Sequence, residues 1–229
     1  MAYVKKTDRK KPWALRTSNV KRVSREFEVR NIFLIYCEGE NTEPEYFKSF
    51  PINTETKVTA IGLGRSKTVL VEKVIAELDK KQYLEGQPDY DPDRRIWCVF
   101  DFDTTNREGE DSDYDHAIDL AESNNINAAC SNDSFELWFL LHYQYTDSQL
   151  TRAEYYQRLS SIFGWNYEEE GKKKDIARSF YGILLEHQNR ALKNAERLHS
   201  TMSKLDPHDQ NPCTRVDKLV LELNKCLKR

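Results

Sequence analysis

The 229-residue sequence lacks the clustered cysteines and histidines that a structural zinc site needs. Its five cysteines form no CxxC pair, and three of them, Cys37, Cys98 and Cys130, lie in apolar runs typical of strands. The other two are Cys213 and Cys226. We therefore exclude a zinc site and interpret the cysteines as reduced core residues.

Long hydrophobic runs are also missing. No apolar stretch approaches the length needed to cross a bilayer, and no secretory h-region follows the start. We therefore expect a cytoplasmic protein with no membrane partner. A wholly disordered chain is excluded as well, because 12 Tyr, 10 Phe and 4 Trp provide bulky side chains for a core.

The sequence has no P-loop. Gly62, Gly64, Arg65 and Lys67 resemble a phosphate cradle, but they do not follow the GxxxxGK[ST] spacing. We reject ATP binding there.

Acidic residues are scarce before the first apolar run, although the net charge of the whole chain is −3. Before Glu26, only Asp8 opposes nine basic residues: Lys5, Lys6, Arg9, Lys10, Lys11, Arg16, Lys21, Arg22 and Arg25. A basic arm on a mildly acidic body suits contact with nucleic-acid phosphates. Charge alone leaves a second interpretation open, which is a solvated tail.

Apolar runs alternate with helical stripes over the next hundred residues. Strands are expected at 31–37, 57–61, 95–100 and 126–130, and helices at 42–50, 66–80 and 113–122. The first of these helices would open with a capping box from Thr42 to Glu45. The order predicts an α/β fold, with a parallel sheet of about four strands flanked by helices.

The pattern becomes helical after residue 131. Helices are expected at 134–143, 151–162, 175–203 and 214–228, and Thr151 to Glu154 reads as a second capping box. We divide the chain into a flexible basic arm (1–27), a catalytic core (28–145) and a helical C-terminal lobe packed on that core (146–229).

Three acidic residues follow predicted strands and carry the chemistry. Glu38 comes after the first strand, and Asp101 and Asp103 come after the third. The carboxyl ends of parallel strands meet at one edge of a sheet, and alternation puts both aspartates on one side. With no obvious basic partner, these carboxylates would repel one another unless a cation lay among them. Isolated acids would only cap helices, but this joint placement favours a Mg²⁺ or Mn²⁺ site.

The sequence also resembles a known family. Glu38-Gly39 after one strand and DxD after a later one resemble the TOPRIM signature of topoisomerases, primases and OLD-type nucleases. More specifically, four segments resemble the RloB-like family: IYCEGENTEPEYF (35–47), VFDFD (99–103), SNDSFELWFLLHY (131–143) and NPCTRVDKLV (211–220). Asp133 and Cys213 depart from the Pro and Ser expected of that family, so those loops can differ in detail.

The resemblance implies a TOPRIM-like core in a nuclease effector of bacterial antiviral defence, of the abortive-infection kind, acting beside an AAA-type ATPase. Its expected chemistry is Mg²⁺-dependent hydrolysis of phosphodiester bonds by Glu38, Asp101 and Asp103. By analogy, RNA such as tRNA is slightly favoured over DNA as the substrate. The alternatives are a non-catalytic nucleic-acid-binding or sensor subunit, and nucleotidyl transfer of the primase kind.

Further candidates surround this site. Glu136 is a candidate metal ligand, because OLD-type sites use a further acid on a following helix; a surface acid is the alternative. Lys172, Lys173 and Lys174 are candidates for binding substrate phosphates, or else form a solvated turn. Asn132 could orient a ligand or cap a helix, and His142 could act as a base or lie in the core.

A last candidate is a docking surface for the ATPase. It is an apolar stripe at helical spacing, and its alternative is packing on the protein's own core: Val216, Leu219, Val220 and Leu223.

Overall fold

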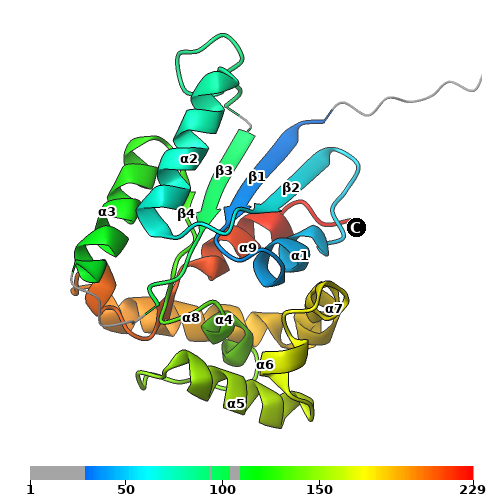
Figure 1. Cartoon of the computed structure of the whole chain (residues 1–229). Helices are drawn as coiled ribbons and strands as arrows, with labels where there is room; N and C mark the ends of the chain where they lie inside the picture. Colours follow the sequence, from blue (N-terminus) through cyan, green and yellow to red (C-terminus); the bar gives the residue numbers. More distant parts are fainter. Residues whose placement is uncertain (1–28, 93, 104–108, 229) are drawn as a thin grey trace, which may run out of the picture.

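The computed structural model describes residues 29–92, 94–103 and 109–228, so the predicted basic arm lies outside the described residues. Within them, four parallel strands form the main sheet in the order β2-β1-β3-β4 (Figure 1). The strands are β1 (Asn31–Cys37), β2 (Thr56–Gly62), β3 (Arg94–Val99) and β4 (Asn127–Ala128). The predicted α/β fold is confirmed, and β4 is shorter than the expected run.

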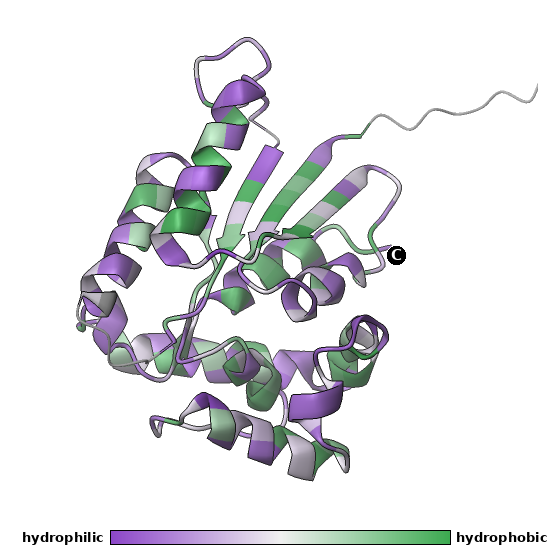
Figure 2. Ribbon diagram, viewed as in Figure 1, coloured by the Kyte–Doolittle hydropathy of each residue, from purple (hydrophilic) through white to green (hydrophobic). Residues whose placement is uncertain are grey.

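Both faces of this sheet are covered by helices. The helices are α1 (Thr42–Lys48) and α9 (Val216–Asn224) on one face, and α2 (Lys67–Lys80) and α3 (Glu110–Ser123) on the other. Helices are needed on both faces because the strands are apolar on both faces. In strand β1, for example, successive side chains point into two different hydrophobic cores. Phe33 and Ile35 pack with α1 and α9, whereas Tyr36 packs with α2 and α3. The strands are accordingly apolar along most of their length (Figure 2).

The remaining helices lie beyond the carboxyl ends of the strands (Figure 1). They are α4 (Glu136–Leu141), α5 (Arg152–Phe163), α6 (Tyr167–Glu170), α7 (Lys174–Leu184) and α8 (Gln188–Met202), with two 3-10 turns, η2 (Leu185–His187) and η3 (Pro207–Asp209). The expected helical C-terminal part is therefore present. Its position places helical residues directly over the edge of the sheet where Glu38 and Asp101 lie.

The single long helix expected over 175–203 is wrong, because η2 divides it into α7 and α8. The buried positions continue at helical spacing across the break, so the sequence gives no sign of it: Ala177, Phe180, Tyr181, Leu184, Gln188, Ala191, Ala195 and Leu198. The break lets the two helices pack on different neighbours. Helix α7 packs on α1, and α8 packs on α4.

A small antiparallel ladder anchors the DxD loop. Strand β5 (Ser131–Asn132) pairs with β6 (Cys213–Thr214), so the last helix begins at Val216 rather than at residue 214. The backbone of the same region holds the loop after β3. The amide of Phe102 donates to the carbonyl of Ser131 (2.9 Å), and that of Asp103 donates to the carbonyl of Asp133 (3.1 Å).

One of the two predicted capping boxes is confirmed. The Thr151 hydroxyl accepts from the Glu154 amide, and the Glu154 carboxylate accepts from the Thr151 amide (2.8 Å). The box at Thr42 is wrong, because α1 has Asn41 at its N-cap and no side-chain cap. The Glu45 carboxylate instead pairs with the side chains of Lys48 and Arg178.

The apolar stripe of α9 is part of the protein's own core. All four of its residues are fully buried, so this stripe is not a docking surface: Val216, Leu219, Val220 and Leu223. In the described part of the chain, no helix is both long and apolar enough to cross a membrane.

Candidate functional site

The two acidic loops meet at the carboxyl edge of the sheet, as the sequence predicts. Strands β1 and β3 are paired in register up to Cys37 and Val99, so the residues that follow them are neighbours. The Glu38 carboxylate accepts a hydrogen bond from the Asp101 amide (3.1 Å). Phe102 turns away and packs against Tyr114, with ring centroids 5.1 Å apart. The alternation expected for the DxD segment is therefore confirmed.

Gly39 is required because a further acid lies beside it. A Cβ atom at residue 39 would lie 2.0 Å from the Glu43 carboxylate oxygen. This contact brings the first turn of α1 against the loop after β1, and buries Glu43 to 6% exposure. Sequence reasoning placed Glu43 in a capping box and missed it as a site residue; the Glu-Gly pair was the signal.

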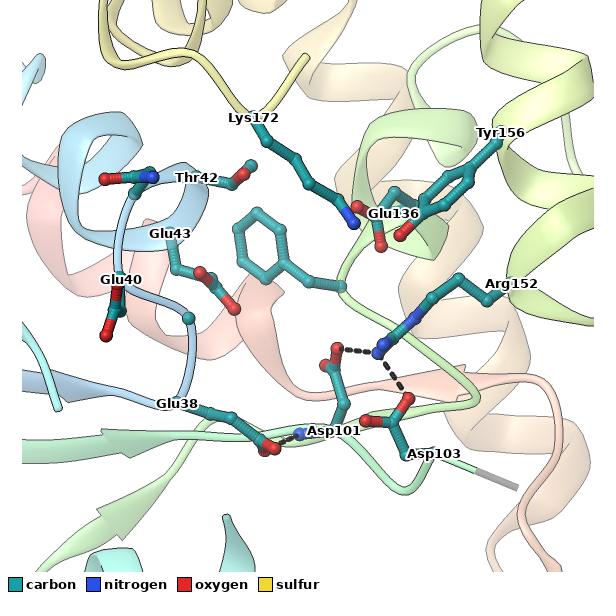
Figure 3. Close-up of a pocket in the computed structure, with 13 residues that line it drawn as sticks. Glu38, Glu40, Thr42, Glu43, Asp101, Asp103, Glu136, Arg152, Tyr156 and Lys172 are labelled. Carbon is teal, nitrogen blue, oxygen red and sulfur yellow. Dashed lines mark hydrogen bonds and ion pairs between the residues drawn. The ribbon is translucent and has the colours of Figure 1, made fainter. Parts of the chain in front are cut away.

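One pocket of about 210 Å³ collects these acids (Figure 3). Its acidic residues come from the loops after β1 and β3 and from two helices: Glu38, Glu40, Glu43, Asp101, Asp103 and Glu136. Arg152, Tyr156 and Lys172 line it from the helical side. The pocket thus has an acidic floor on the sheet and cationic groups opposite.

Arg152 supplies the basic partner that the sequence did not reveal. This residue begins α5, and one of its guanidinium nitrogens contacts both Asp101 (3.0 Å) and Asp103. Its Nε atom is buried and has no hydrogen-bond partner among the residues that the structure describes. The expectation that the aspartates have no basic partner is therefore wrong. The contact joins segments fifty residues apart, which no local pattern predicts.

Burial raises the pKa of three acids of the pocket, Glu38, Glu43 and Asp101. It raises the pKa of Glu38 to about 7, and repulsion by Asp103 adds to the effect, while the Asp101 amide opposes it. It also raises the pKa of Glu43 to about 7, with repulsion from Glu136 and Glu38. Burial raises the pKa of Asp101 too, although the Arg152 guanidinium opposes the shift. Negative charge is therefore costly here without a cation.

Comparison with protein families decides what kind of protein this is. The family model described as RloB-like protein matches residues 33–223. The chain belongs to the RloB-like family. Comparisons with curated proteins and with solved structures gave no match.

The donor chemistry of this RloB-like pocket fits a hard divalent cation, because its clustered groups are carboxylates whose negative charge is unfavourable on burial. Within residues 29–92, 94–103 and 109–228, however, no three acidic, histidine or cysteine side chains are arranged to hold a metal ion. Arg152 contacts two of the three expected ligands. Metal binding therefore requires this guanidinium to leave Asp101 and Asp103.

Of the remaining candidate residues of the RloB-like chain, some line the pocket and others do not. Glu136 is buried, lines the pocket and accepts a hydrogen bond from the Tyr167 hydroxyl (3.2 Å). Lys172 also lines the pocket, and its ammonium lies 4.9 Å from the Tyr156 ring centroid (Figure 3). Lys173 instead pairs with Glu170 (2.6 Å).

The last three candidates do not line the pocket. Lys174 begins α7, and the Asn132 amide donates to the carbonyl of His208 (2.7 Å). His142 is fully buried, and its Nδ1 atom lies 2.9 Å from the Trp138 carbonyl. Burial lowers the pKa of His142 to about 4, so the ring is a neutral core group.

The lowered pKa of His142 makes the stability of the folded protein depend on pH. Its folded-state pKa is about 4, below the unfolded value of about 6.5, so its contribution is complete above pH 6.5 and is lost as pH falls through 4. The shift corresponds to roughly 2–4 kcal/mol. We expect His142→Gln to lose less unfolding free energy than the wild type between pH 7 and pH 4, measured by denaturant unfolding.

The exposed His116 on α3 provides the matched control. His116→Gln is expected to keep the wild-type pH dependence. Equal acid sensitivity of the wild type and His142→Gln would contradict the core assignment of His142.

Proposed function

We propose that this RloB-like protein is a metal-dependent nuclease that hydrolyses phosphodiester bonds. The observation that carries the proposal is the pocket itself, which six acidic residues line together with Arg152 and Lys172. Metal-dependent phosphodiester hydrolysis uses this combination, because acids hold a cation and basic groups receive the phosphate. The TOPRIM-like order of Glu38-Gly39 and DxD supports the same assignment.

The acids have distinct proposed roles. Glu38, Asp101 and Asp103 would hold Mg²⁺ or Mn²⁺, with Glu136 as a further ligand. When bound, the ion neutralises charge that develops on the phosphate and promotes formation of hydroxide from water. The raised pKa of Glu38, about 7, also suits a group that takes up and releases a proton near neutral pH.

The cations have roles on the substrate side. Arg152, once released from the aspartates, presents a guanidinium that can bind two phosphate oxygens. Its partnerless Nε atom supports this role, because a buried donor without an acceptor is unfavourable. Lys172 reaches the pocket from the segment between α6 and α7 and provides a second positive charge (Figure 3).

The biological setting is proposed from the family resemblance. The protein would act as a defence effector beside an AAA-type ATPase, with RNA such as tRNA slightly favoured over DNA.

The Arg152 ion pair favours an alternative in which the protein is a non-catalytic sensor, because the guanidinium occupies the aspartates that would bind the metal. Incubating purified protein with tRNA, plasmid and single-stranded DNA separates these functions, using Mg²⁺, Mn²⁺ or EDTA. Cleavage that EDTA abolishes supports the nuclease.

Asp101→Asn is expected to abolish cleavage. The amide is nearly the same size but lacks the charge that binds a cation, so loss of activity of at least about 100-fold is expected. Asp119→Asn makes the same chemical change on the exposed surface of α3 and should retain activity. Melting temperatures of both variants check that they are folded. Full activity of folded Asp101→Asn would end the metal-site proposal.

Lys172→Ala is expected to weaken substrate binding and to reduce its salt dependence. Each phosphate contact releases counterions, so the slope of log affinity against log salt should fall by about 1. Lys173→Ala removes the same charge one residue away, where it pairs with Glu170, and should change the slope less. Equal slopes for the two variants in filter-binding titrations would contradict a phosphate contact and would support the alternative, in which Lys172 belongs to a solvated turn.

A further inference from the structure

A second cluster of reactive side chains lies away from the carboxylate pocket. The Cys213 sulfur on β6 is 3.6 Å from Nδ1 of His199 on α8. The other ring nitrogen, Nε2, is 3.0 Å from the Asp217 carboxylate on α9. Three elements therefore place a thiol, an imidazole and a carboxylate in series, which is the order that activates cysteine nucleophiles.

Basic groups lie beside the sulfur. The hydrogen bonds with Asp217 and Cys213 raise the pKa of His199 to about 9, so the imidazole is cationic at neutral pH. The Arg215 guanidinium interacts electrostatically with the same thiol. The other groups that interact with it are the buried Tyr114 and Cys130.

Two other functions fit this cluster less well. His199 directs one nitrogen at the sulfur and the other at the carboxylate, and no metal-binding group of three is present in the described residues. A hydrolase would need room for its substrate at the sulfur, whereas Cys213 is only 5% exposed.

We propose that Cys213 is a site of selective oxidation by small hydroperoxides, activated by His199, Asp217 and Arg215. A small uncharged oxidant suits the site, because the sulfur is buried while the His199 side chain is 28% exposed beside it. In the reacting form the thiol proton is on His199; the sulfur attacks one peroxide oxygen, so that an S–O bond forms and the O–O bond breaks. The leaving hydroxide takes the proton of His199 and departs as water. The sulfur is oxidised by two electrons to a sulfenic acid, and the peroxide is reduced.

The position of Cys213 connects this chemistry to the DxD loop. Cys213 pairs with Asn132 in the β5-β6 ladder. The neighbouring Ser131 and Asp133 carbonyls accept hydrogen bonds from the amides of Phe102 and Asp103. Because Cys213 is only 5% exposed, an added polar oxygen is expected to displace β5 and the loop. Only this effect on activity rests on the proposed nuclease function.

Hydrogen peroxide is the probe, and the full-length reduced protein is the sample. After timed exposure and quenching, the protein is unfolded, its remaining thiols are alkylated, and each cysteine peptide is quantified by mass spectrometry. Cys226 is the internal control, because it is 4% exposed and equally buried. We expect Cys213 to lose its thiol at least about tenfold faster than Cys226. Equal rates in the wild-type protein would overturn the proposal.

His199→Gln and Asp217→Asn separate activation from simple exposure. The first should bring the Cys213 rate to that of Cys226, and the second should slow it partially. An unchanged preference for Cys213 in folded His199→Gln would contradict activation by the imidazole. If His199→Gln does not fold, the Asp217→Asn variant is used instead, and an unchanged preference for Cys213 in that variant would contradict activation by the imidazole. Because the readout is thiol loss, the result stands whether or not the protein cleaves nucleic acid.

Discussion

The ion pair between Arg152 and the two aspartates after β3 is the interaction on which the arrangement of the site depends. The sheet gathers carboxylates at its carboxyl edge, where burial raises the pKa of Glu38, Glu43 and Asp101. A cation must offset that charge, and in this structure a guanidinium from α5 does so. The same contact holds the helical part of the chain over the edge of the sheet. In the proposed function, binding of a metal and binding of the helical part would therefore compete for the same oxygens.

This competition gives the proposed nuclease a simple form of restraint. While Arg152 contacts Asp101 and Asp103, these two carboxylates are not free to bind the proposed divalent ion. Once they bind the ion, the Arg152 guanidinium becomes available to a phosphate. Helix α5 carries both Arg152 and Tyr156 into the pocket, so a shift of this helix would change the site as a unit. A partner that moves α5, such as the proposed ATPase, could control the nuclease without contributing a catalytic residue.

The sequence reveals those parts of the site that local pattern controls. Glu38, Asp101 and Asp103 could be located because buried parallel strands read as apolar runs, and ligands follow their carboxyl ends. Arg152 could not, because its role arises from tertiary packing between distant segments. Glu43 was hidden by its capping-box pattern, although its contact with Gly39 decides its position. The break at η2 was invisible for a related reason, since the buried positions of α7 and α8 keep one helical period across it.

Anomalous diffraction from crystals of the protein soaked in Mn²⁺ tests the central claim most directly, because it locates the metal and Arg152 in one experiment. The account predicts a manganese peak bounded by Glu38, Asp101 and Asp103, with the Arg152 guanidinium moved away from both aspartates. A structure at saturating Mn²⁺ that shows no peak in the pocket, with Arg152 still paired to Asp101 and Asp103, would contradict it.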